Sequence, residues 1–210
     1  MIGPIFSDSV EQAAPVVQQA GINMIALSNN SAVARPGVYL SGLLPELQVD
    51  RVVRYAASRG IQQFGALLPT GAFGSRVRET LRLTLAELGL DLVRTEYFGD
   101  SLNDVSRAVR EISDYDSRHA ALQRQKAALS GAEDEVSRRT LARLERMETF
   151  GPAPFEALIV AASGQQLTRV AAQLGNYDID TKTVRLLGLS SWAAPGTGRE
   201  PALVGAWFAA

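Results

Sequence analysis

Five polar segments carry the side chains that could do chemistry in this 210-residue sequence. Each follows an apolar run of strand length: Ser7, Ser28 to Asn30, Pro69 to Gly74, Ser163-Gly164 and Ser190 to Trp192. The carboxyl ends of parallel strands open onto one crevice, so we expect these segments to meet there. They offer hydroxyl and amide groups without a histidine, a lysine or a close pair of carboxylates, the usual groups of acid–base and nucleophilic catalysis. The set predicts binding and no catalytic residue.

The rare residue types narrow the chemistry further. The sequence has no cysteine, which removes thiolate nucleophiles, disulfides and cysteine metal sites, and its single histidine is His119. Histidine-cluster metal sites and most Ser-His hydrolase designs therefore lack their base, and we expect neither a metal ion nor another cofactor. The net charge of −1 lacks the basic field that nucleic-acid binding requires, so no nucleic-acid partner is expected. No stretch approaches the roughly 20 apolar residues of a membrane span, so no transmembrane segment is expected.

Two aromatic residues lie in the candidate segments. The loop Gly71 to Ser75 resembles a phosphate-binding loop only superficially, because it lacks both the Gly-Lys-Ser/Thr ending and the Gly-x-Gly-x-x-Gly spacing. Its glycines predict a tight turn before a helix, which leaves Phe73 projecting toward the crevice. Trp192 has two interpretations: it stacks on a ligand, or it packs beside its strand as loop aromatic residues equally often do.

The start of the sequence predicts a buried strand that runs into a capped helix. Ile2 to Phe6 is mostly apolar, and Ser7-Asp8-Ser9 offers acceptors where a helix leaves its first N–H groups unsatisfied. Asp8 followed by Glu11 has the form of a capping box. Ser7 is then either a helix cap alone or a binding residue, since open α/β proteins bind ligands where a strand end meets a helix N-terminus. The chain begins and ends within a fold, so we expect additional coding sequence.

Along the chain, apolar runs alternate with stretches of helical period, and this alternation predicts an α/β fold of parallel strands covered by helices. The predicted strands are 2–6, 22–27, 38–40, 64–68, 92–98, 155–162, 184–187 and 203–208. The predicted helices are 9–20, 46–59, 75–88, 105–113 and 165–174, and Gly60, Gly89 and Gly175 stand where helices commonly end.

Residues 117–147 interrupt this pattern, because they are rich in Arg, Glu, Gln and Ala and contain no strand-like run. Gly131 breaks the segment and Ser130 with Glu133 has the form of a capping box, which predicts two helices in an inserted hairpin. The apolar positions are sparse, so each helix buries only a narrow stripe. The hairpin is then either a solvated decoration or a grip for a partner protein.

The order of several short motifs resembles a known family. Ile-Gly-Pro-x-x-Ser at 2–7, Ala-Pro-Val at 14–16, Gly-Ile-Asn-Met-Ile-Ala-Leu-Ser at 21–28 and Phe-Gly-Ser at 73–75 are similar to the type I periplasmic binding proteins of the leucine/isoleucine/valine-binding class. The resemblance covers residues 1–114 and 155–210. It implies two lobes, each a parallel sheet with helices on both faces, that close on a small ligand. It assigns 1–42 to an incomplete first lobe, 43–202 to the second lobe with the 117–147 hairpin, and 203–210 to the start of the crossover back to the first lobe.

The resemblance implies ligand-binding roles for six residues, with several departures from the amino-acid-binding pattern. Ser7 matches the serine that holds the ligand carboxylate, Ser28 stands where a backbone group receives the ammonium, and Asn30 replaces a typical threonine. Phe73 replaces a tyrosine, Ser163 stands where another aromatic residue is usual, and Ser190 occupies the place of the acidic residue that pairs with the ammonium. An ammonium without this carboxylate is costly to desolvate, which counts against amino-acid transport.

A subgroup of the family suits these departures and the hairpin better. The sequence looks like the binding-protein-like domain of outer-membrane lipoproteins that activate penicillin-binding proteins. This resemblance implies a periplasmic regulator of peptidoglycan synthesis, anchored to the outer membrane through a lipidated N-terminus that this chain lacks, with a penicillin-binding protein as partner. The alternative is the solute-binding component of an ABC importer for branched-chain or other amino acids, with an ABC permease as partner and a small polar ligand.

Overall fold

The computed structural model describes residues 1–131, 134–194 and 196–209. Its contacts divide the chain into two compact units, Met1–Gln48 (unit 1) and Val49–Ala210 (unit 2). Across the described ranges, no helix is both long enough and apolar enough to cross a membrane. Both units consist of parallel strands and helices, as the sequence predicts.

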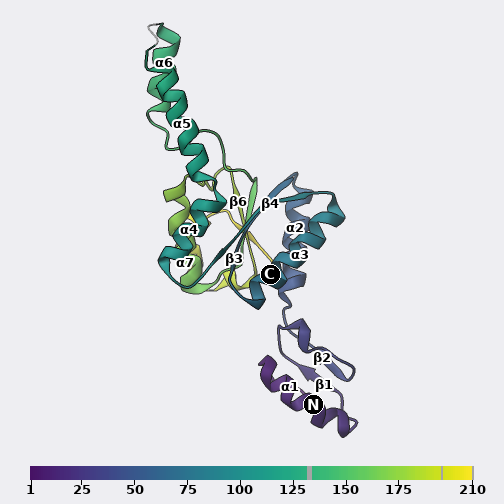
Figure 1. Ribbon diagram of the computed structural model, residues 1–210. Helices are drawn as coiled ribbons and strands as arrows, with labels where there is room; N and C mark the ends of the chain where they lie inside the picture. Colours follow the sequence, from purple (N-terminus) through teal and green to yellow (C-terminus); the bar gives the residue numbers. More distant parts are fainter. Residues whose placement is uncertain (132–133, 195, 210) are drawn as a thin grey trace. The chain divides into compact units, whose positions relative to one another are not determined.

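Unit 1 packs one helix on a two-stranded parallel sheet (Figure 1). The elements are α1 (Ser7–Gln19), β1 (Met24–Ala26), the 3₁₀ turn η1 (Ser31–Val33) and β2 (Val38–Leu40). Helix α1 buries Val10, Ala14 and Val17, which recur every three or four residues and pack with Met24 and Ala26 of β1. The helix therefore covers the face of β1 that carries the even-numbered side chains.

The opening segment is not the buried strand that the sequence predicts. Ile2 is 78% exposed and forms only an isolated parallel bridge with Ile25, while Phe6 is 75% exposed. Helix α1 begins at Ser7, and its N-cap residue is Phe6, whose side chain has no acceptor to offer. Asp8 consequently lies inside the first turn, where its charge complements the helix dipole, and the expected cap with Glu11 is wrong.

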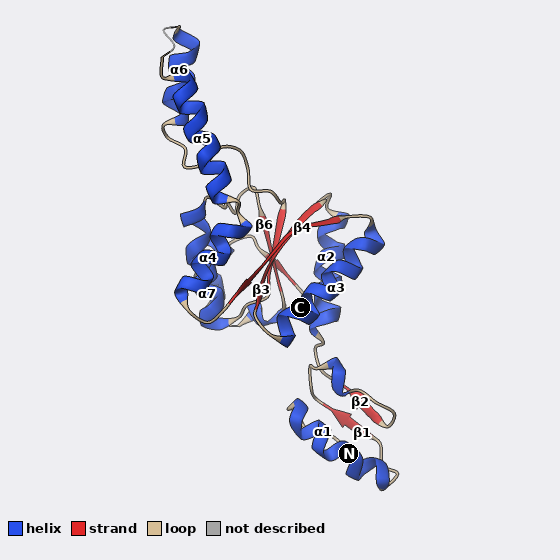
Figure 2. Ribbon diagram, viewed as in Figure 1, coloured by secondary structure: helices blue, strands red, loops and turns tan. Residues whose placement is uncertain are grey.

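Unit 2 is built on a five-stranded parallel sheet in the order β4-β3-β5-β6-β7 (Figure 2). Its strands are β3 (Gln63–Pro69), β4 (Asp91–Phe98), β5 (Ala157–Val160), β6 (Arg185–Gly188) and β7 (Trp207–Phe208). Ala66 of β3 lies opposite Thr95 of β4 on one side and Ile159 of β5 on the other. Because β5 is buried on both faces, it reads as a continuous apolar run. The strand order also sets the carboxyl ends of β3, β5 and β6 side by side.

Helices cover both faces of this sheet (Figure 2). One layer holds α2 (Pro45–Ser58) and α3 (Ala72–Leu88), and the other holds α4 (Leu102–Ile112) and α7 (Gly164–Leu174). Neighbouring residues of one strand enter different cores, since Ala66 packs with α2 and α3 whereas Leu67 packs with α4 and α7. The alternation of side chains along a strand thus builds two hydrophobic cores from one sheet.

Two helices form an arm that extends away from the sheet of unit 2 (Figure 1). They are α5 (Tyr115–Leu129) and α6 (Glu135–Leu144), and their buried residues in the described part are Arg118, Leu122 and Leu144. Glu133, half of the expected capping box, lies outside the described residues. Asp134 caps α6 instead, since its carboxylate accepts a hydrogen bond of 2.9 Å from the backbone N–H of Ser137.

The last predicted strand forms only at its end. Leu203 closes a 3₁₀ turn, η5 (Pro201–Leu203), and the strand β7 begins four residues later at Trp207. The N–H groups of Leu203, Val204 and Ala206 donate to carbonyls three residues earlier and are therefore not available to a ladder, which explains why the strand starts late. Three further turns are η2 (Gly175–Tyr177), η3 (Ser190–Ala193) and η4 (Thr197–Arg199).

Candidate functional site

Three of the predicted site residues lie together in unit 1. Ser7 begins α1 and Ser28 follows β1, and their hydroxyl oxygens are 3.2 Å apart. The backbone N–H of Asn30 donates to the Ser28 hydroxyl at 3.2 Å, and the Asn30 side-chain carbonyl accepts from Ala32 N at 3.2 Å. Ser28 is only 1% exposed, whereas Ser7 and Asn30 are half-buried. We call Ser7, Ser28 and Asn30 the serine cluster.

A close backbone approach holds the loop of the serine cluster in place. A Cβ atom added to Gly42 would lie 2.4 Å from the carbonyl oxygen of Ser28, nearer than real Cβ contacts allow. Only glycine therefore lets the segment after β2 pass the end of β1 at this distance. The Ser41 N–H also donates to Ala26 O at 2.8 Å, which extends the pairing of the two strands to their ends.

The serine cluster has hydrogen-bond donors to offer. Ser28 Oγ and Asn30 Oδ1 each accept one backbone N–H, while the hydroxyl proton of one serine and the Asn30 NH₂ group remain to donate. The first turn of α1 has no side-chain cap, which leaves backbone N–H groups at the same end of the helix. Donors around a helix N-terminus suit an acceptor-rich group such as a carboxylate.

The other three predicted residues follow neighbouring strands of unit 2. Phe73 lies in the first turn of α3 after β3, Ser163 is the exposed N-cap residue of α7 after β5, and Ser190 begins η3 after β6. Phe73 is half-buried and packs against the core beneath α2 and α3 rather than projecting freely. The structure thus collects these residues along one edge of the unit 2 sheet, as expected of parallel strands.

Trp192 packs into the core and is not exposed for stacking on a ligand. Its ring is 3% exposed, and its Nε1–H donates to Ala162 O at 2.9 Å. A Cβ atom added to Gly188 would lie 2.1 Å from Cδ2 of Trp192, so the ring rests directly on the backbone of β6. Of the two interpretations that the sequence leaves open, packing is the one that the structure supports.

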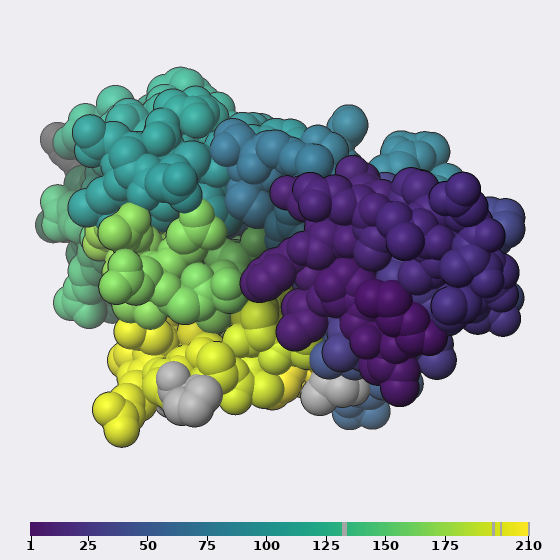
Figure 3. Space-filling view, turned by 90° about the horizontal axis from the view of Figure 1, so that it is seen from below, coloured from purple at the N-terminus to yellow at the C-terminus, as the bar shows by residue number. Residues whose placement is uncertain are grey.

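A surface cavity of about 610 Å³ opens beside the Ser163 end of α7. In the space-filling view the C-terminal segment, in yellow, lies next to the light green of this region (Figure 3). The described lining comes from α7 and the following turns: Gly164, Gln165, Leu167, Thr168, Arg169, Ala194, Gly196, Thr197 and Leu203. The cavity adds polar side chains to the edge that the sequence analysis identified by its serines.

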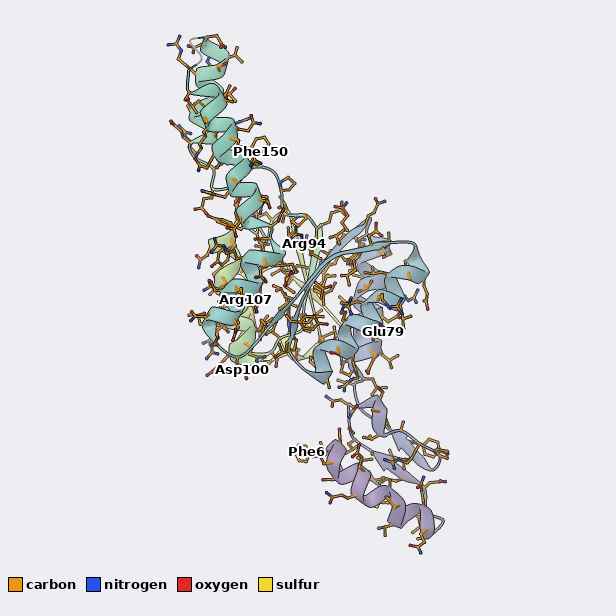
Figure 4. The ribbon with its side chains drawn as sticks, viewed as in Figure 1. Phe6, Glu79, Arg94, Asp100, Arg107 and Phe150 are labelled. Atoms are coloured by element: carbon orange, nitrogen blue, oxygen red, sulfur yellow. The ribbon has the colours of Figure 1, made fainter. Side chains whose placement is uncertain are left out.

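Arg169 is the cation that the sequence analysis missed at this edge. Its Nη1 donates to the backbone carbonyl of Asp100 at 2.7 Å, and Gln166 donates to the Asp100 carboxylate at 2.5 Å (Figure 4). These bonds tie the first turns of α7 to the loop before α4. The helical spacing of the sequence could have indicated Arg169, because it lies four residues after Gln165 and therefore on the same face of the predicted helix.

Carboxylates lie beside both groups of residues: Asp8 follows Ser7 in α1, Glu46 accepts a hydrogen bond of 2.8 Å from Ser31, and Asp100 accepts one from Gln166. Among the described residues, no group of three His, Asp or Glu side chains is arranged to hold a metal ion. The carboxyl group with a clearly raised pKa, Glu96, lies on β4, where burial is the main cause and neighbouring Glu111 adds to it. The candidate residues themselves are uncharged, and the charged groups beside them are these carboxylates and the Arg169 guanidinium.

Comparison with known proteins places this geometry in a family. An uncharacterized protein of Rickettsia prowazekii (strain Madrid E), RP748, is 27% identical over 113 residues, which are 54% of this chain and 30% of that protein. The LpoA C-domain from Haemophilus influenzae, described as a regulator of PBP1A, is 18% identical with a TM-score of 0.53, over 90% of this chain and 47% of that one. An ABC transporter substrate-binding protein from Desulfitobacterium hafniense, in complex with Leu, is 14% identical with a TM-score of 0.56, over 91% and 46%.

The comparisons agree on the fold and differ in what the matched proteins do. The chain spans about 30% of the curated relative and less than half of each of these two structures. At identities below 20% the structural likeness carries the fold alone. Residues 1–210 match the periplasmic binding protein family, and the chain belongs to that family, with the type I, leucine-binding-like fold.

Proposed function

We propose that this protein is a non-catalytic regulator of peptidoglycan synthesis that acts in the periplasm by binding a penicillin-binding protein. The observation that carries the proposal is the α5–α6 arm of unit 2, whose described residues are mostly exposed and whose helices extend beyond the sheet (Figure 1). Binding of a small solute does not need such an arm, whereas an exposed arm offers a surface for contact with another protein. The likeness to the LpoA C-domain, a regulator of PBP1A, supports this assignment.

The composition of the candidate residues supports the same proposal. Ser190 carries no charge in the position where the amino-acid-binding pattern has an acidic residue. A ligand ammonium placed there would lose its water without gaining a carboxylate, which costs more than most single hydrogen bonds return. By the resemblance, the chain keeps the family fold and lacks the acidic residue that pairs with the ligand ammonium. In this proposal the protein is lipid-anchored to the outer membrane.

A second candidate function is the solute-binding component of an ABC importer for branched-chain or other amino acids. The serine cluster favours it, because Ser7 and Asn30 present donors at the N-terminal end of α1. The substrate-binding protein that was solved with Leu shares the fold. A thermal-shift panel of amino acids tests this candidate, since a ligand at 100 times its Kd stabilises a protein by about 2.7 kcal/mol.

The arm tests the first proposal directly. Arg143 and Arg146 lie on the exposed surface of α6 and just beyond its end, without an ion pair among the described residues. We expect the double variant R143E/R146E to bind a purified penicillin-binding protein of the same organism about tenfold more weakly in a biosensor assay, since two buried-interface contacts of about 0.7 kcal/mol each give this factor.

The matched control reverses two exposed arginines elsewhere on unit 2, Arg59 and Arg78. The R59E/R78E variant has the same change in net charge, so it reports the loss from general electrostatics. The proposal predicts wild-type binding for this control. The proposed function is contradicted if the wild-type chain shows no detectable binding. It is also contradicted if R59E/R78E weakens binding as much as R143E/R146E does.

A further inference from the structure

The buried guanidinium of Arg118 forms hydrogen bonds with several segments of unit 2 at the base of the arm. Arg118 lies in the first turn of α5 and is 8% exposed. Its Nη1 donates to Ser113 O, at the end of α4, over 3.2 Å. Its Nη2 and Nε donate to Gly151 O, in the loop that returns from α6, over 2.9 and 3.3 Å. The chain that enters the arm and the chain that leaves it are therefore joined through one side chain.

The same guanidinium also reaches the end of α7. Nη2 of Arg118 contacts a carboxylate oxygen of Asp178 at 3.2 Å and the Asp178 backbone carbonyl at 3.3 Å. Asp178 closes the η2 turn after α7 and has a φ of +53°, a conformation that Asn and Asp adopt more readily than other side chains. Thr149, 1% exposed, donates its hydroxyl to the same carboxylate oxygen. We call Arg118, Thr149 and Asp178 the latch.

Contacts around the latch close the base of the arm further. The N–H of Phe150 donates to Arg118 O at 3.1 Å, so the returning loop runs alongside the start of α5 (Figure 4). The His119 ring nitrogen Nδ1 lies 2.8 Å from Glu148 O, and Tyr115 contacts Tyr177 of η2 edge to face with ring centroids 5.4 Å apart. A merely solvated hairpin would not need a base of this kind.

The stability of the latch depends on whether the Arg118 guanidinium keeps all of its hydrogen-bond acceptors. Burial lowers the pKa of Arg118, and the charge of Asp178 opposes that effect. The guanidinium stays protonated, because arginine keeps its charge in proteins, so its five N–H groups must find acceptors in a site with little water. The Arg118 side chain is 9% exposed and that of Asp178 is 40% exposed, so the pair is half-buried. Removing Asp178 leaves the charge of a buried guanidinium uncompensated, which is more damaging than losing an ion pair exposed on both sides.

We propose that Arg118, Thr149 and Asp178 lock the arm to the end of α7, so that α5 and α6 project from unit 2 in one fixed direction. This inference goes beyond the proposed function, because it stands on the contacts at the base of the arm whatever the protein binds. A fixed arm presents its surface without losing orientational freedom on binding, which an arm that swings would lose. The direction of the arm is then set by α7, the helix whose first turns line the cavity.

The absence of cysteine allows a direct measurement of this rigidity. Cysteines introduced at Ala127, on the exposed side of α5, and Arg78, on the exposed side of α3, would be the only thiols and take one spin label each. Double electron–electron resonance on the full chain then gives the distribution of distances between the arm and the sheet layer. We expect one narrow distribution in the labelled wild type and at least a doubling of its width in R118Q.

Two further variants keep the test decisive. D178N preserves the size of the side chain and tolerates a positive φ, so it removes only the charge of the partner, and it should broaden the distribution in the same direction. The control R110Q breaks an exposed ion pair with Asp116 at the same base of the arm, where the side chains are 51% and 69% exposed, and should leave the width unchanged.

Circular dichroism of each variant shows whether the helices remain. If R118Q loses helical signal, the width of the distance distribution in D178N alone tests the proposal. A broad distribution in the wild type overturns the proposal, and so do unchanged widths in R118Q and D178N. Equal broadening in R110Q overturns it as well, because the exposed pair of Arg110 and Asp116 would then hold the arm as firmly as the half-buried pair of Arg118 and Asp178.

Discussion

The contact of Trp192 with Gly188 and Ala162 gives a quantitative test of how the edge of unit 2 is held. Replacing Trp192 by Phe removes the Nε1–H that donates to Ala162 O over 2.9 Å. A buried carbonyl left without this donor costs about 1–3 kcal/mol. The smaller ring also buries less apolar area, worth about 1 kcal/mol. We therefore expect W192F to lower the free energy of unfolding by about 2–4 kcal/mol.

A second substitution approaches the same contact from the strand. In G188A the new Cβ would lie 2.1 Å from Cδ2 of Trp192, well inside the 3.0 Å that real Cβ contacts keep. Overpacking of this kind costs about 1–3 kcal/mol. If the clash is with the indole, the smaller Phe ring relieves it, so G188A should cost less in W192F than in the wild type. A double-mutant cycle then gives a coupling energy of about 1 kcal/mol.

Urea unfolding followed by circular dichroism at 222 nm measures these values, and equal m-values establish that the variants unfold over the same surface. The matched control is W207F, because Trp207 is half-buried at the sheet edge and contacts Tyr55 and Arg185. It should cost less than W192F. Additive effects of G188A and W192F, or a W192F variant as stable as the wild type, would refute the reasoning that the indole holds this edge.

Two further predictions concern carboxylates. Burial, with a contribution from Glu111, raises the pKa of Glu96 above its usual value, so the native state binds this proton more tightly than the unfolded state does. Stability from this group is therefore lost as pH rises through the raised pKa, and E96Q should have a higher Tm than the wild type at pH 7 and an equal one at pH 4. The Ser137 hydrogen bonds lower the pKa of Asp134, the cap of α6. D134A should destabilise α6, seen as faster amide exchange at its first turn, while D134N retains protection.

Elements with a repeating pattern could be predicted from the sequence almost in full. Residues Val49, Val52, Val53 and Ala56 recur at helical spacing, and all are buried on α2, which begins and ends within one residue of the prediction. Strand β2 has the predicted bounds, and β3 is one residue longer at each end. Here local periodicity and tertiary burial agree, so pattern alone is sufficient.

The errors come from segments whose outcome depends on distant residues. Ile2 to Phe6 is apolar enough for a buried strand, but nothing in that pattern says whether another layer covers it, and Phe6 is 75% exposed. Trp192 looks the same in sequence whether it faces a ligand or the backbone of Gly188. Arg118 is one of many arginines in its segment, and its role depends on Asp178, 60 residues away. Long-range contacts of this kind leave no periodic signal.

The candidate site raises the question of which charge a ligand would carry. The serine cluster has donors to offer, the hydroxyl proton of one serine and the Asn30 NH₂ group, and Arg169 lies beside the cavity at the other set of residues. Neither set contains a carboxylate side chain. Donors stabilise an anionic group, whereas an ammonium finds no charged partner among these residues.

A matched pair of compounds separates these two charges. Leucine and 4-methylpentanoate share the carboxylate and the branched side chain, and only leucine carries the ammonium. We expect 4-methylpentanoate to raise the Tm more than leucine at equal concentration, and S7A to reduce that gain because Ser7 supplies a hydroxyl at the end of α1. A larger shift with leucine would mean that a carboxylate outside these residues balances the ammonium, and the donor-only account of the site would have to be abandoned.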